Sequence, residues 1–142
     1  MGSCNGKYEQ ILGELKDELK NHAKSKAMVN NILNAWIYIS NKKNYVQGTF
    51  CELFYYWLGD LISKDVNTST SSSFSKTMQN VYGILKNCSN IDKCKNKYPG
   101  IDTGNFERMK ELYDYKYYYR EWKSNRKSCS LLMEEVTELR IQ

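Results

Sequence analysis

The sequence has little histidine, arginine and proline, and each scarcity narrows the possible functions. Its one histidine, His22, leaves no second imidazole for a metal site or a cysteine–histidine relay. Its four arginines stand against 17 lysines, and this balance disfavours a phosphate-binding surface for nucleic acid despite the net charge of +5. No apolar run approaches the roughly 18 residues that a membrane span needs, so we predict no transmembrane segment in these residues.

Sequence motifs of catalysis are also missing. The chain contains no GxGxxG, P-loop, GxSxG or HExxH motif. The adjacent carboxylates Glu134 and Glu135 would point about 100° apart on a helix, which suits solvation rather than shared acid–base work. We therefore expect a protein that is not an enzyme and has no catalytic residue, no cofactor and no metal ion.

Apolar residues recur at helical spacing through most of the chain. With 41% hydrophobic and 26% charged residues, the 142-residue chain has the composition of a folded globule. The periodicity predicts an all-α fold, a compact bundle of about five to six helices held by disulfides, with two long loops. The expected helices cover residues 6–24, 28–40, 50–62, 74–88 and 106–123, and a last one starts at Ser128 or Ser130.

The third of these helices has the strongest pattern. Its apolar residues from Phe50 to Ile62 draw a wide stripe, which predicts the most buried helix of the domain. We place Phe54, Tyr56, Trp57 and Leu58 in the core.

Polar and turn-forming residues separate the helices. The low-complexity run 64–73 and the Cys-, Pro- and Gly-bearing run 88–104 are predicted loops within one helical domain that spans residues 4–142. Residues 1–3 are either the natural start or residues added before it.

Five cysteines remain: Cys4, Cys51, Cys88, Cys94 and Cys129. Their spacing does not suit zinc, which needs pairs two to four residues apart. They stand at the ends of expected helices, where disulfides can join neighbouring helices. Reduced cysteines in a cytosolic protein are the alternative.

Two motifs resemble the Plasmodium interspersed repeat (PIR) family, and its Plasmodium vivax Vir branch in particular. The first is the run from Cys51 to Asp60, Cys-Glu-Leu-Phe-Tyr-Tyr-Trp-Leu-Gly-Asp. The second is the run from Lys110 to Tyr115, Lys-Glu-Leu-Tyr-Asp-Tyr. The order of the other cysteines agrees, and the resemblance covers roughly residues 4–129.

The resemblance implies a non-enzymatic variant surface antigen of a malaria parasite. It implies export to the surface of the infected erythrocyte or of the parasite, and a role in host-receptor binding, adhesion or immune evasion. The expected partner is a host cell-surface receptor or an antibody; no nucleic acid is expected, and a membrane would be reached only through a segment absent from this chain. An intracellular helical interaction module and a basic nucleic-acid-binding domain are the alternatives.

The resemblance also suggests a disulfide pairing. Cys4 would pair with Cys51, and Cys129 with either Cys88 or Cys94. Because the number of cysteines is odd, at least one thiol is free, bonded outside this chain, or without a partner among these residues.

Aromatic residues from 113 to 122 surround the helix expected at 106–123. They are more numerous than one buried face can hold, and Tyr115, Tyr118 and Trp122 share a stripe that differs from that of Tyr113 and Tyr117. We predict that this stripe binds a partner, because aromatic side chains bury large areas at little entropic cost. Burial of both stripes between helices is the alternative.

Overall fold

The structure is a computed structural model that describes residues 4–65 and 71–124, with side chains described over 4–65 and 73–117. It divides into two units, residues 1–107 and 108–142, each of which is described by itself. The helices are α1 (Tyr8–Glu18), α2 (Ala23–Ala27), α3 (Val29–Ser40), α4 (Asn44–Asp65), α5 (Ser71–Cys88) and α6 (Thr103–Ser124). No strand occurs in the described ranges, and the all-α prediction is confirmed.

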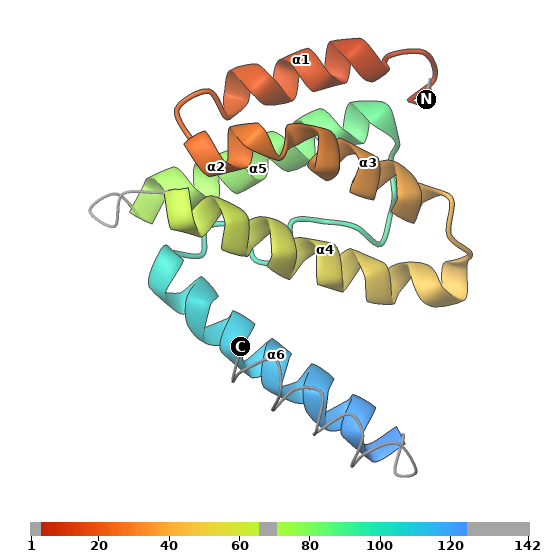
Figure 1. Cartoon of the computed structure of the whole chain (residues 1–142), viewed down its shortest axis with the longest axis vertical. Coiled ribbons are helices and arrows are strands. Elements are labelled where there is room, and N and C mark those ends of the chain that lie inside the picture. Colours follow the sequence, from red (N-terminus) through yellow and green to blue (C-terminus); the bar gives the residue numbers. More distant parts are fainter. Residues whose placement is uncertain (1–3, 66–70, 125–142) are drawn as a thin grey trace, which may run out of the picture. The chain divides into compact units, whose positions relative to one another are not determined.

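Four helices of the first unit form its core. α1 packs on α5 and α3, α4 packs on α3 and α5, and the short α2 lies against α4 (Figure 1). Each helix buries apolar residues three and four positions apart, as amphipathic helices do. The fully buried side chains include Ile11, Leu15, Ile32, Leu33, Leu58, Ile62, Met78 and Val81.

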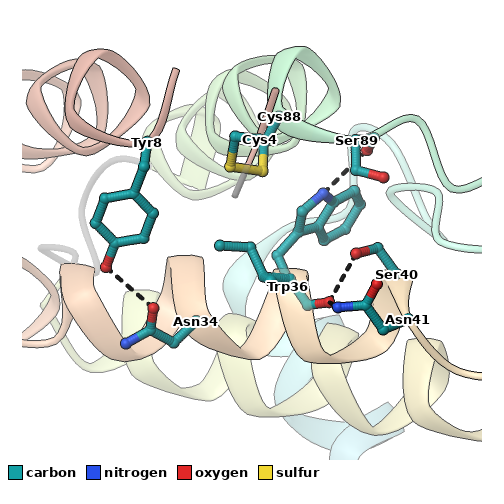
Figure 2. The surroundings of a disulfide bond; sticks show 9 residues. Cys4, Tyr8, Asn34, Trp36, Ser40, Asn41, Cys88 and Ser89 are labelled. Atoms are coloured by element: carbon teal, nitrogen blue, oxygen red, sulfur yellow. Dashed lines mark hydrogen bonds between the residues drawn. A yellow bond between two sulfur atoms is a disulfide. The ribbon is translucent and has the colours of Figure 1, made fainter. Parts of the chain in front are cut away.

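Three aromatic rings, one from each of three helices, meet at the centre of this core. The Trp36 ring centroid lies 5.5 Å from that of Phe54 and 5.9 Å from that of Tyr82, the latter in an edge-on arrangement. The Trp36 indole Nε1 donates a hydrogen bond of 3.0 Å to the backbone oxygen of Ser89 (Figure 2). A buried indole N–H needs such an acceptor, so this bond fixes the backbone after α5 against α3.

The helix predicted over residues 6–24 is shorter than expected. It ends at Glu18, and a separate helix, α2, begins at Ala23. The carboxylate of Asp65, at the end of α4, accepts hydrogen bonds from the backbone N–H groups of Lys24 (3.3 Å) and Ser25 (2.7 Å) and from the Ser25 hydroxyl (2.8 Å). These donors are left unpaired at a helix start, so a carboxylate distant in sequence caps α2.

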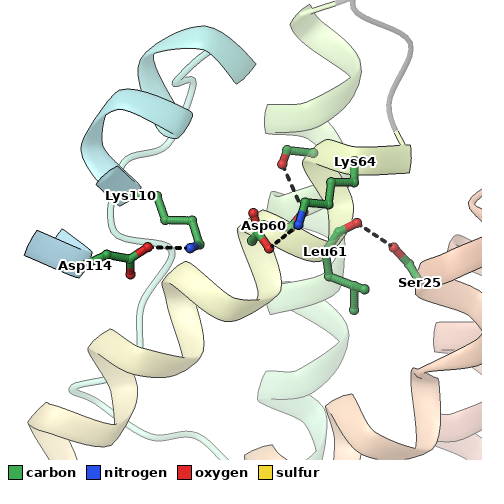
Figure 3. Close-up of polar contacts among 7 residues, drawn as sticks. Ser25, Asp60, Leu61, Lys64, Lys110 and Asp114 are labelled. Atoms are coloured by element: carbon green, nitrogen blue, oxygen red, sulfur yellow. Dashed lines mark hydrogen bonds and ion pairs between the residues drawn. The ribbon is translucent and has the colours of Figure 1, made fainter. Parts of the chain in front are cut away.

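Ser25 is fully buried and links α2 to α4 a second time. Its hydroxyl also lies 3.5 Å from the backbone oxygen of Leu61 (Figure 3). The contact between α2 and α4 therefore includes hydrogen bonds from Ser25 to both Asp65 and Leu61.

Gly59 of α4 provides the space for Phe106. A Cβ atom at Gly59 would overlap the Phe106 ring, which also packs on Tyr55 and Phe74 with centroids 5.7 and 5.0 Å away. Phe106 is held there because Asp102 caps α6, accepting a 2.7 Å hydrogen bond from the Asn105 N–H.

The two predicted loops differ in accuracy. The loop at 88–104 is confirmed, since α5 ends at Cys88 and α6 begins at Thr103. The loop at 64–73 is wrong at both ends, because α4 continues to Asp65 and α5 already begins at Ser71. The helix expected after Ser128 or Ser130 lies outside the described residues, and the single domain over 4–142 stays a prediction.

We expect Gly59→Ala to destabilise the fold by about 1–3 kcal/mol, because the added methyl group overpacks the site that Phe106 fills. The matched control is Gly13→Ala in α1, where no atom lies within 4 Å of the added Cβ. That change should stabilise the protein by up to about 1 kcal/mol, the helix preference of alanine over glycine. Urea unfolding measures both, and equal effects of the two variants would contradict the account.

The capping carboxylate predicts a specific dependence on pH. Burial acts to raise the pKa of Asp65, but the hydrogen bonds from Ser25 and Lys24 outweigh it and lower the pKa below 3.8. The stabilisation is thus present above the unfolded pKa and is lost as the pH falls through the folded pKa. Asp65→Asn should cost about 1 kcal/mol at pH 7, and the cost should shrink below pH 4.

Asp60→Asn is the control for this experiment. Asp60 is also on α4, and it forms a surface ion pair of 3.0 Å with Lys64 (Figure 3). Such pairs contribute little, so its removal should change stability by less than about 0.5 kcal/mol. A cost for Asp65→Asn that is the same at pH 7 and pH 3 would refute the capping role.

Disulfide framework and candidate interaction surfaces

Two disulfides lie in the first unit. Cys4 is bonded to Cys88, and Cys51 is bonded to Cys94. All four residues are at most 5% exposed. The bonds join the start of the chain to the end of α5, and the first half of α4 to the segment that follows α5.

The predicted pairing is wrong. Cys4 precedes α1, and α1 packs on α5, so the cysteine that ends α5 is the one within reach. Cys4 has a left-handed backbone conformation (φ 64°). Its sulfur atom is bonded to that of Cys88 (Figure 2). Because Cys88 and Cys94 are both taken, neither is bonded to Cys129. Cys129 itself lies outside the described residues.

The described residues contain no group of three histidine, cysteine or carboxylate side chains that could hold a metal ion. His22 lies in the turn before α2 rather than on the first helix, and its Nδ1 atom is buried without a hydrogen-bond partner among the residues described. His22 therefore lies near the Asp65 carboxylate that caps α2. The sequence has no second histidine with which it could form a metal site.

Three of the four residues that the sequence places in the core of the third expected helix are buried. Phe54, Tyr56 and Leu58 are buried, as predicted. The prediction that Trp57 is buried is wrong, because its side chain is 36% exposed. The apolar stripe of α4 is wider than the face that α3 and α5 cover, so its outer edge remains at the surface.

Trp57 forms one wall of a shallow apolar groove of about 230 Å³ between α3 and α4. We call it the α3–α4 groove. Its lining includes Tyr38 and Ile39 from α3, and Phe50, Leu53, Phe54 and Trp57 from α4. Tyr38 is 53% exposed, so large aromatic surfaces border the groove. Exposed apolar clusters of this kind are typical of interaction sites.

The predicted aromatic site on α6 is only partly within the described side chains. Tyr115 is 71% exposed, while the side chains of Tyr118 and Trp122 lie outside the description. The Tyr113 and Tyr117 rings stack with centroids 6.3 Å apart. On the same helix Lys110 and Asp114 form an ion pair of 2.7 Å (Figure 3). The assignment of Tyr115, Tyr118 and Trp122 to partner binding stays a prediction.

A larger cleft, of about 960 Å³, lies along α1 and α5. Its lining mixes carboxylates, lysines and amides, including Glu18, Asn80, Lys86 and Lys95. Glu18 already accepts a hydrogen bond of 3.1 Å from Asn80. The cleft is therefore polar and carries both positive and negative side chains.

The fold and the disulfides define a small all-α domain of the kind built for an oxidising environment. The family follows from the sequence: residues 2–133 match the sequence model described as Plasmodium vivax Vir protein. The chain belongs to this family, which is one of variant surface antigens of malaria parasites, and the resemblance drawn from the motifs is confirmed. Comparisons with curated proteins and with solved structures gave no match.

Over residues 4–65 and 71–124, none of the helices combines the length and the apolar character that crossing a bilayer requires.

Sequence reasoning missed the α3–α4 groove. One signal pointed to it: the apolar stripe of α4 spans more residues than one buried face accommodates. Tyr38 gave a second signal, because it lies on α3 close to Trp36 in sequence but outside the stripe of Ile32, Trp36 and Ile39 that is buried.

Removing either disulfide should destabilise the protein strongly. The loops closed by the two bonds span 84 and 43 residues. The chain-entropy relation gives about 4–5 kcal/mol for each. We expect the double variants Cys4→Ser/Cys88→Ser and Cys51→Ser/Cys94→Ser each to lose several kcal/mol in urea unfolding, whereas Cys129→Ser should behave as the wild type. A Cys129→Ser variant as unstable as the other two would contradict the observed pairing.

Proposed function

We propose that the chain is a non-enzymatic domain of a variant surface antigen, displayed on the infected erythrocyte or on the parasite surface. There it contacts host receptors or antibodies and serves adhesion or immune evasion. The observation that carries the proposal is the pair of buried disulfides in a member of the Vir family.

The disulfides favour this proposal over an intracellular interaction module. Protein disulfides persist in oxidising compartments and are rare in the cytosol, where thiols are kept reduced. Four of the five cysteines are bonded and buried, so the fold itself depends on oxidation. An intracellular module with reduced cysteines would leave four buried thiols that stabilise little.

The distribution of charge supports a protein partner over nucleic acid. The four arginines are few for phosphate recognition. The Lys97 ammonium group is already paired with the Glu52 carboxylate at 2.7 Å. The exposed aromatic residues, Tyr115 among them, are the side chains that protein interfaces prefer.

The proposal predicts that the oxidised domain binds a host cell surface and that the α6 aromatic residues take part. Tyr115→Ala combined with Tyr118→Ala should abolish binding to host cells in flow cytometry, without a change in the circular dichroism spectrum. Loss of two central aromatic contacts typically costs more than about 2 kcal/mol.

Lys116→Ala, at an exposed position beside Tyr115, is the matched control and should bind as the wild type does. Failure of the oxidised wild-type domain to bind any cell type in a broad panel would contradict the proposed function. Undiminished binding by the double tyrosine variant would remove only the α6 site.

A further inference from the structure

We infer that the α3–α4 groove is a second, independent binding site, and that its occupant is an amphipathic helical segment of another protein, apolar on one face and rich in Asp and Glu. This goes beyond the proposed function, since it specifies a partner by its chemistry. It does not depend on the aromatic residues of α6.

The groove has the form of a site for protein side chains. Ile39 and Phe54 are 4% and 3% exposed and form its floor, while Tyr38 and Trp57 stand at its edges, 53% and 36% exposed. Its volume of about 230 Å³ is below the range of about 300–1,000 Å³ that holds small-molecule ligands. Trp and Tyr are the residues that most often dominate binding energy at interfaces.

The chain segment that contains α3 and leads into α4 carries positive charge and no carboxylate. From Leu19 to Cys51 the sequence has no Asp or Glu but five lysines, and α3 has no charged residue at all. The Lys42 Nζ lies 4.1 Å from the centroid of the Tyr38 ring and 5.6 Å from that of Phe50, at the edge of the groove. Lys43 follows it and is exposed.

The nearest carboxylates along α4 are neutralised by partners of their own. Glu52 is paired with Lys97 and Asp60 with Lys64, at 2.7 and 3.0 Å. An incoming segment therefore meets an apolar groove with the Lys42 ammonium group at its edge, and carboxylates flanking the apolar face of that segment would complement this charge.

The backbone N–H and C=O groups of the occupant must also form hydrogen bonds when it binds in the groove. The described residues offer no strand edge to which an extended peptide could add. A helix makes its own backbone hydrogen bonds, so it can place apolar side chains at i, i+3 or i+4, and i+7 into a groove without unpaired N–H groups. A second copy of this chain would bring Lys42 and Lys43 toward another lysine-bearing surface, which disfavours self-association.

The test is selection of binders from a displayed library of helical peptides on the oxidised, intact domain. We expect enrichment of peptides with apolar residues at helical spacing and with Asp or Glu beside them. The best peptide, measured by calorimetry, should bind Trp57→Ala at least about tenfold more weakly than the wild type, as loss of a central aromatic residue does. Tyr45→Ala removes a tyrosine that is 81% exposed and outside the groove, and it should change the Kd less than twofold.

A second experiment reverses the charge of Lys42, at the edge of the groove, and of Lys43, which follows it. Lys42→Glu combined with Lys43→Glu should weaken the acidic peptide at least about tenfold, whereas Lys20→Glu, an exposed lysine in the turn before α2, should have less than a twofold effect. Enrichment of neutral or basic peptides, no enrichment, or equal losses for Trp57→Ala and Tyr45→Ala would overturn the inference.

The Trp57→Ala variant also distinguishes two other possible occupants of the groove. A concentration-dependent dimer in ultracentrifugation that Trp57→Ala abolishes would identify a second copy instead. Binding to vesicles of phosphatidylserine that Trp57→Ala abolishes would identify a membrane instead. Either result overturns the inference while leaving the proposed function open, because that function is tested on cells through Tyr115 and Tyr118.

Discussion

The fold of the first unit depends on two covalent bonds that meet in the short segment at the end of α5. Cys88 ties this segment to the start of the chain, and Cys94 ties it to α4. Between them, Ser89 accepts the hydrogen bond of the Trp36 indole at the centre of the core. The disulfides stabilise the protein mainly by lowering the conformational entropy of the unfolded chain, whereas the aromatic contacts lower the energy of the folded state. Both effects therefore hold the segment that follows α5.

This arrangement suits a surface antigen. Covalent bonds and packed aromatic rings hold the helices, so the stability of the fold depends less on the outer surface. The α3–α4 groove is an example, because Trp57 belongs to the apolar stripe of α4 yet remains exposed. A frame of this kind also tolerates substitutions on its surface, which are usually within about 0.5 kcal/mol of neutral. Sequence variation is what a family of variant antigens requires.

Local pattern predicted the helices, and distant contacts decided what it missed. The stripe Met28 to Ser40 gave α3 to within a residue, because its apolar spacing is itself the cause of the helix. The separate start of α2 is capped by Asp65, which lies 40 residues beyond Ser25 in the sequence, so local spacing does not encode it. The disulfide pairing failed for the same reason: it follows from α1 packing on α5, a tertiary choice that spacing does not encode. Trp57 was misplaced because periodicity shows how wide an apolar stripe is but not how much of it neighbours will cover.

The most direct test of this account is peptide mapping of the non-reduced protein by mass spectrometry, after digestion with free thiols blocked. The observed pairing predicts one linked pair of peptides that contains Cys4 and Cys88 and another that contains Cys51 and Cys94. A peptide that links Cys129 to Cys88 or Cys94, or four blocked thiols at positions 4, 51, 88 and 94, would contradict it.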